Sequence, residues 1–282
     1  MKNILIIIVF AFNFIKAEAQ IPSKEFDKAK MEYKGTKTTQ AKLLMRHVEM
    51  WGKINEKEAK LDNAYLNILS SNIDITKQQL QKYLSSKNII NSEIGGDINS
   101  PISHVLAGGQ EVFAKYFVIH DVSTPVYQTN FPTNINDESW SFNNIDRWNK
   151  KVTHVYLTRT GKSKTVADFS EGLRATKFEL KTLGIPSRGL YIHIELVQPR
   201  VYPPGNAVNA PVAPKPGFTE AQYQRLALLY ICSSFRKGEW LVPAFHANID
   251  QNLNDSHDDP QNFETQKFTD QILKLLEAIK EN

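Results

Sequence analysis

Four stretches of the chain carry the hydrophobic pattern of β-strands. Residues 115–120 and 240–245 are apolar runs that indicate buried strands. Residues 189–197 alternate with a period of two, so one face of the strand is wholly apolar and the other carries a histidine and a glutamate. Residues 152–168 hold two β-type runs around an Arg-Thr-Gly-Lys turn, which predicts a hairpin.

Helical patterns precede these strands. Residues 21–92 are rich in Lys, Glu, Met and Leu, and we expect a small helical region there without candidate chemistry. Thr38 or Thr39 is the expected cap of a first helix, whose apolar stripe continues past His47. Thr76 is the expected cap of a second helix.

Loops and helices alternate in the rest of the chain. Glycine pairs and a proline in residues 93–110 predict a loop, and six prolines in 198–217 predict a stiff one. Thr219–Gln222 matches a capping box that opens a helix ending near Lys237. Residues 263–281 have the spacing of an amphipathic helix.

The first twenty residues predict an exported protein. Lys2 precedes an apolar run at 4–15, and residues 17–19 (AEA) fit the small-x-small pattern of a cleavage site, which makes Gln20 the expected mature N-terminus. The run is too short to span a bilayer comfortably. We therefore expect a secreted or periplasmic chain without stable membrane insertion.

Composition narrows the class of protein. With 41% hydrophobic and 23% charged residues the chain has the balance of a globular protein, and a net charge of +4 is too small to predict a nucleic-acid partner. The only cysteine, Cys232, falls in an apolar stretch, which excludes an intrachain disulfide and a Cys-rich zinc site. We divide the chain into a signal peptide (1–19), a helical region with a linker (20–110) and a second domain (111–282).

Candidate chemistry lies where strands end. His120 closes one buried strand, and His246 follows another, with Asp259 one loop later. The carboxyl ends of strands are where α/β proteins place their sites, so two of these side chains are plausible metal ligands. His193 and Glu195 share one strand face and are a further candidate pair, or else a solvated pair on an exposed edge.

The long polar loop 121–151 is the other candidate region. It carries Trp140 and Trp148, which either form a binding wall or pin the loop to the core. We expect His47 and His104 to be structural or solvated, and His154 to be structural or to support a ligand.

The order of these motifs resembles a known family. In the zinc-dependent N-acetylmuramoyl-L-alanine amidases of type 2, similar elements follow one another in the same order: a strand with His, a hairpin, a strand with Glu, a capped helix, a strand with His, and a loop with Asp-Pro. Peptidoglycan recognition proteins share the fold of this family. The resemblance covers roughly residues 115–265. Its carriers are 117–121 (FVIHD), 153–161 (THVYLTRTG), 192–196 (IHIEL), 218–223 (FTEAQY), 244–246 (AFH) and 258–260 (DDP).

The resemblance implies a fold and a site. The fold would be α/β, a mixed central β-sheet flanked by helices, preceded by the small helical N-terminal region. His120, His246 and Asp259 would hold Zn²⁺, and Glu195 would be the catalytic carboxylate. Three protein ligands leave zinc an open position for water, which is the mark of a catalytic site.

The chain departs from the family near the third ligand. Many members have a lysine where this chain has His257, and we expect His257 to donate to the oxyanion instead. The segment between the second histidine and Asp259 is long, so Asp255 and Asp258 stay open as alternative ligands. The expected substrate-binding residues are Trp140, Trp148, Tyr156 and His193.

The function implied by this resemblance is hydrolysis of the amide between N-acetylmuramic acid and L-alanine in peptidoglycan or muropeptides. A recognition module that binds muropeptide without cutting it is the first alternative. A zinc hydrolase acting on another amide is the second. Stem-peptide preference, oligomeric state and the role of residues 20–110 are not readable from the sequence.

Overall fold

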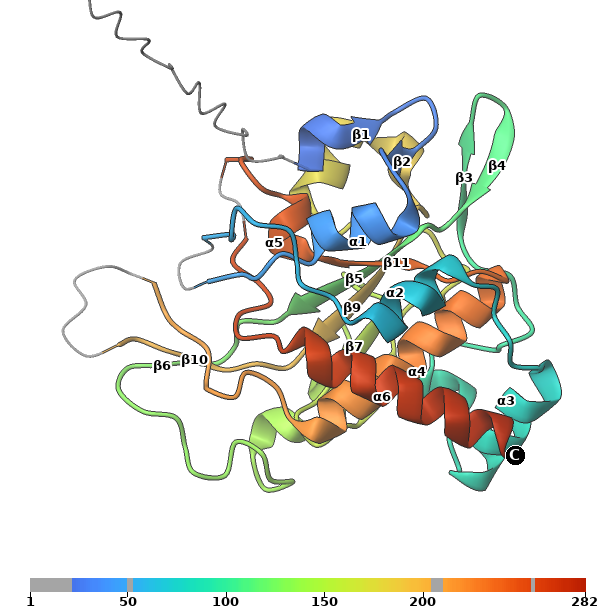
Figure 1. Ribbon diagram of the computed structural model, residues 1–282. Helices are drawn as coiled ribbons and strands as arrows, with labels where there is room; N and C mark the ends of the chain where they lie inside the picture. Colours follow the sequence, from blue (N-terminus) through green and yellow to red (C-terminus); the bar gives the residue numbers. More distant parts are fainter. Residues whose placement is uncertain (1–21, 50–52, 204–209, 255–256) are drawn as a thin grey trace, which may run out of the picture.

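A central five-stranded sheet organises the molecule. The computed structural model describes residues 22–49, 53–203, 210–254 and 257–282, so the expected signal peptide lies outside the described residues. The sheet contains, in spatial order, β11 (Val242–Phe245), β5 (Tyr116–Asp121), β9 (Tyr191–Leu196), β7 (Val155–Leu157) and β8 (Ser163–Thr165). The first four strands are parallel and β8 runs antiparallel to β7. The predicted α/β fold with a mixed sheet flanked by helices is therefore confirmed (Figure 1).

Strand register brings the polar ends of the strands together. His120 on β5 lies opposite Glu195 on β9, and Tyr156 on β7 also lies opposite Glu195. The last residue of β11 pairs with Ile119, so the chain leaves the sheet there at His246. Because the strands are parallel, these side chains gather at the carboxyl ends of the strands.

Two helices cover one face of the sheet. These are α4 (Glu220–Lys237) and α6 (Thr265–Lys280), which cross in front of the strands in Figure 1. Tyr230 on α4 contacts Phe117 on β5, with ring centroids 5.3 Å apart. Helix α4 begins with the predicted capping box of Thr219 and Gln222, and ends at a left-handed Gly238.

The start of the N-terminal region covers the other face, whereas its Tyr65 contacts Tyr230 on α4 and Phe268 on α6. Strands β1 (Phe26–Asp27) and β2 (Glu32–Tyr33) form a small pair, next to the π-helical turn η6 (Phe178–Leu183). Tyr33 stacks edge-on against Tyr116 at 5.2 Å, and Tyr116 stacks on Tyr191 at 5.1 Å. The strand face that carries His193 is therefore buried, not the exposed edge considered as one interpretation.

Both predicted N-terminal helices exist, the first of them shorter than expected, and a third helix that was not predicted lies between them. They are α1 (Lys37–Leu44), α2 (Asn63–Ser70) and α3 (Lys77–Ser86). The cap of α1 is Thr36, and neither Thr38 nor Thr39, and the helix ends before His47, which is exposed. Thr76 caps α3 in a full capping box, as predicted.

The prediction of a loop over residues 93–110 is wrong for the second half of that range. Strands β3 (His104–Ala107) and β4 (Gln110–Phe113) form a hairpin around Gly108 and Gly109, and Figure 1 shows it standing away from the body of the molecule. Both glycines have positive φ, which a two-residue turn of this kind requires. The remaining elements are η1 (Pro22–Glu25), η3 (Asn91–Glu93), β6 (Val126–Tyr127), η4 (Ser141–Asn143), η5 (Ile145–Arg147), η7 (Ile185–Ser187), β10 (Arg200–Val201) and α5 (His246–Ile249).

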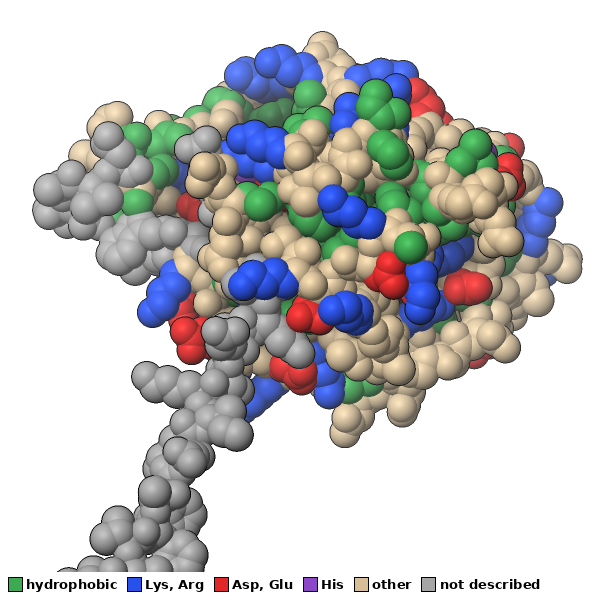
Figure 2. Space-filling model, turned by 90° about the horizontal axis from the view of Figure 1, so that it is seen from above, with side chains coloured by type: hydrophobic (Ala, Val, Ile, Leu, Met, Phe, Trp, Pro, Cys, Tyr) green, Lys and Arg blue, Asp and Glu red, His purple; other side chains and the backbone are tan. Residues whose placement is uncertain are grey.

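One large hydrophobic core joins these parts. It runs from Phe26 and Tyr33 through the sheet to Ile279 on α6, and includes Cys232, which is buried as expected. The division of the chain into residues 20–110 and 111–282 stays a prediction. Among the described residues, no helix has the length and apolar character that crossing a bilayer requires. Lys and Arg side chains are spread over the face shown in Figure 2, in keeping with the modest net charge of +4.

Candidate metal centre

Three donor atoms converge where β5 and β11 end. His120 Nδ1 lies 2.9 Å from His246 Nδ1, and His246 Nδ1 lies 3.1 Å from Asp259 Oδ2. The third side of this triangle, from His120 Nδ1 to Asp259 Oδ2, is 3.8 Å. The structure thus brings together the three side chains expected to bind a metal, all of them buried.

The triangle has the size of a zinc site. Zinc bonds of 2.0–2.1 Å in a tetrahedron place neighbouring donor atoms roughly 3.3 Å apart. The three observed separations lie on both sides of that value. Two imidazoles and one carboxylate are also ligands that zinc prefers, so the residues present fit the ion.

Without a metal, the positive charge of protonated His246 offsets the negative charge of the Asp259 carboxylate. Burial alone would lower the pKa of His246, but Asp259 and Asp250 raise it to about 10. Burial lowers the pKa of His120 well below its usual value, and the neighbouring His246 adds to this effect. His246 in its charged form in turn lowers the pKa of Asp259 against the effect of burial. The pocket is therefore built to hold positive charge between carboxylates.

Glu195 faces the triangle from the neighbouring strand. Its Oε1 lies 3.9 Å from His120 Nδ1, and its Oε2 is buried without a hydrogen-bond partner. Burial raises the pKa of Glu195 to about 8, and the charge of Asp259 adds to the rise. A carboxylate with a free oxygen at this distance can reach a water molecule on the open side of the donors.

The two aspartates before Pro260 point in different directions. Asp259 points at the two histidines, whereas Asp258 points at Gln261 and, at 3.7 Å, at Arg200. Asp255 lies outside the described residues. His257 is about half exposed, and its ring stacks on that of His246 with centroids 4.1 Å apart. His257 is therefore placed at the mouth of the site.

Each histidine of the triangle uses its second ring nitrogen for a buried partner. His246 Nε2 lies 2.9 Å from Asp250 Oδ2, and His120 Nε2 lies 3.0 Å from His193 Nδ1. Such contacts fix the tautomer and the orientation of a ligating imidazole. With its second nitrogen occupied, each ring presents Nδ1 to the triangle.

A pocket of about 570 Å³ is lined by two of the three donor residues, His246 and Asp259, and by Glu195. Trp148 and Tyr156 line it, with ring centroids 5.4 Å apart, as two of the expected substrate-binding residues. Two others lie elsewhere. Trp140 is nearly buried in a small aromatic cluster, and His193 is fully buried behind His120. Further lining residues are Lys151, Val152, Arg174, Ala175 and Leu180.

Sequence reasoning missed several residues around the site. Asp250 stands four residues after His246, a spacing that places two side chains on one helical face. The residues 176–179 (TKFE) match a capping box, which would have located Glu179 at a helix start. The buried pair of Asp121 and Arg200, 2.8 Å apart, carries no sequence signal.

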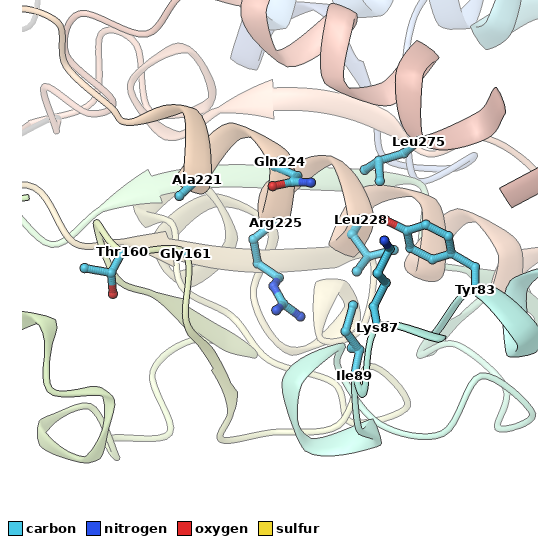
Figure 3. A pocket seen from close by; sticks show the side chains of 10 residues that line it. All are labelled: Tyr83, Lys87, Ile89, Thr160, Gly161, Ala221, Gln224, Arg225, Leu228 and Leu275. Carbon is cyan, nitrogen blue, oxygen red and sulfur yellow. The ribbon is translucent and has the colours of Figure 1, made fainter. Parts of the chain in front are cut away.

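A second pocket lies elsewhere on the molecule. It has a volume of about 320 Å³ between α3, α4, α6 and the turn after β7, and Figure 3 shows Arg225 and Lys87 among its lining side chains. The described residues that line it include neither histidine nor carboxylate. Candidate metal chemistry therefore belongs to the first pocket.

Comparisons with known proteins add a distant likeness. No protein-family model and no curated protein matches the sequence. A solved structure is similar to this chain. It is a crystal structure of a selenomethionine AmpD derivative, 16% identical, with 65% of this chain and 99% of that chain covered at a TM-score of 0.34. A score of this size does not establish a shared family, so the chemistry is argued from the geometry of the site.

Proposed function

We propose that this protein is a zinc-dependent amidase that cleaves the bond between N-acetylmuramic acid and L-alanine in peptidoglycan or muropeptides. The observation that carries the proposal is the donor triangle of His120, His246 and Asp259 beside Glu195, at a pocket that Glu195, His246 and Asp259 line. Two histidines, one aspartate and a free carboxylate in one pocket are the minimal set for metal-assisted amide hydrolysis.

The side chains divide the chemistry between them. A zinc ion held by the three donors would polarise the amide carbonyl and make water more acidic. Glu195 Oε2, which has no other partner, takes the proton from the attacking water and passes it to the leaving nitrogen. His257 at the mouth donates to the oxyanion that forms on the carbonyl.

The pocket walls suit a sugar-peptide substrate. Trp148 and Tyr156 offer aromatic surface on one side of the donors. Arg174 offers positive charge to the carboxylates of a stem peptide, and Lys151 beside it is paired with Glu171 at 2.9 Å. Intact peptidoglycan lies outside the cytoplasm, which agrees with the export predicted from residues 1–19.

A digest tests the proposal directly. Mature protein is incubated with purified peptidoglycan, with and without a zinc chelator, and the products are read by mass spectrometry. Stem peptides that begin with L-alanine are expected, lost on chelation and restored by zinc. Intact muropeptides with folded, zinc-loaded protein would favour a binding module instead.

Glu195→Gln isolates the catalytic carboxylate. Removal of a general base lowers turnover by about 10²–10⁴-fold, and we expect zinc content to remain at the wild-type level. Glu138→Gln is the matched control, because Glu138 is exposed and pairs with Lys162. Wild-type turnover in Glu195→Gln would exclude the role assigned to this residue.

A further inference from the structure

Four successive backbone amides anchor two carboxylates behind the metal centre. The N–H groups of Ala175 and Thr176 donate to Glu179 Oε2, at 3.1 and 3.0 Å. Those of Lys177 and Phe178 donate to Asp250, each at 2.9 Å. One short segment thus fixes both acids, and both are fully buried.

Each of these acids stands behind one ligating histidine. Asp250 contacts His246 directly, whereas Glu179 reaches His120 through His193. His193 Nε2 lies 3.2 Å from Glu179 Oε2, at an angle outside that of a regular hydrogen bond. Glu179 and His193 are both completely shielded from solvent, so this electrostatic contact acts at low dielectric.

The direction of hydrogen-bond donation from His120 through His193 to Glu179 follows from the nitrogen that His120 presents to the metal. If His120 presents Nδ1 to a cation, its Nε2 carries the hydrogen and donates to His193 Nδ1. His193 must then carry its own hydrogen on Nε2, which faces Glu179. A carboxylate at that end stabilises this arrangement of hydrogens and makes Nδ1 of His120 a better ligand.

We propose that Glu179, acting through His193, is a positioning residue for the metal ligand His120. The inference rests on the metal centre of the proposed function, and it concerns the affinity for zinc rather than the reaction. Outer partners of this kind typically change metal affinity 10–100-fold when they are replaced.

Glu179 also has a structural task that the test must separate. Its carboxylate and the Thr176 hydroxyl form a reciprocal capping box at the start of η6, with Glu179 N to Thr176 Oγ1 at 3.1 Å. Glutamine serves equally in a capping box. Glu179→Gln therefore keeps the cap and an acceptor oxygen, and removes the charge that faces His193.

Thr176→Val is the matched control, because it breaks the cap, including the hydroxyl's hydrogen bond to Glu179 Oε2 at 3.0 Å, and keeps the charge of the carboxylate. The zinc dissociation constant is measured by competition with a chelator, and the stability of the metal-free protein by denaturant unfolding. We expect Glu179→Gln to bind zinc about tenfold more weakly or worse with unchanged stability. Thr176→Val should lose stability and keep its zinc affinity.

A His193→Phe background tests whether the effect passes through His193. In that background we expect Glu179→Gln to leave the zinc affinity unchanged, since the intermediate ring is gone. Zinc affinity within twofold of the wild type in the single variant Glu179→Gln would overturn the inference. So would an equal loss in Thr176→Val, or additive losses in the double variant. Tight zinc binding without digestion of peptidoglycan would refute the amidase alone.

Discussion

At the scale of single residues, the seven histidines have different tasks that their spacing in the sequence does not reveal. His120 and His246 present Nδ1 to one another, at 2.9 Å. Both ring nitrogens of His154 instead contact backbone groups. Its Nδ1 accepts from His193 N–H at 3.0 Å, and its Nε2 lies 3.0 Å from the Glu171 carbonyl. His154 is therefore a structural residue, as the sequence suggested.

This bonding predicts a pH dependence of stability. Burial lowers the pKa of His154 to about 3, with His193 adding to the effect. Between the unfolded value near 6.5 and this folded value the unfolded chain binds the extra proton, so stability falls as pH falls. The contribution is at most about 1.4 kcal/mol per pH unit.

His154→Asn isolates that contribution, because the amide oxygen can replace Nδ1 as acceptor. Unfolding free energies measured from pH 7 to pH 4 should show a slope smaller by about one proton than in the wild type. His47→Asn, at an exposed position, is the control. An unchanged slope in His154→Asn would show that His154 is not a neutral buried group.

At the scale of elements, the sequence predicted the features that depend on residues close together in the chain. The capping boxes of Thr76 and Thr219 marked helix starts correctly, because each depends on residues three positions apart. Strand β9 was recognised because its alternation extends over its whole length. The hairpin around Gly108 and Gly109 also had a signal, and glycine pairs are as typical of two-residue turns as of loops.

Other elements exist only because of tertiary packing. Strands β1 and β2 have two residues each, too few for any periodicity. The length of α1 was overestimated, because the apolar residues after Leu44 enter the core from an extended chain: Val48 pairs in an isolated bridge with Ile54. In the site, His120, His246 and Asp259 were placed through an order of motifs, whereas the contact of Glu179 with His193 becomes visible only in the folded chain.

The β1–β2 pair gives a prediction for the N-terminal region. Tyr33 is fully buried against Tyr116, so Tyr33→Ala leaves a cavity over the sheet and should cost about 3–5 kcal/mol of unfolding free energy. Lys34→Ala, next in the chain and exposed, should stay within about 0.5 kcal/mol. Denaturant unfolding followed by tryptophan fluorescence measures both. A loss confined to a separate minor transition would mean that this region folds independently of the sheet.

At the scale of the whole molecule, the donor triangle ties together distant parts of the chain. His120 comes from the second strand of the sheet, His246 from the end of its edge strand, and Asp259 from the returning loop. The loop is held there by Ala247 N–H, which donates to the Asp259 carbonyl at 2.9 Å. An ion bound to all three donors would therefore link strands and loop that unfolding separates, and binding free energy would appear as stability.

Zinc should accordingly raise the thermal midpoint. At a free concentration 100 times the dissociation constant, binding to the folded state alone adds about 2.7 kcal/mol, or roughly 5–10 °C for a chain of this length. Calorimetry of chelated and zinc-restored protein measures the shift. His246→Ala should abolish it because one donor is lost, whereas His104→Ala, on the exposed hairpin, should retain it in full. A shift that survives in His246→Ala would place the stabilising ion elsewhere and remove the triangle as the basis of the proposed chemistry.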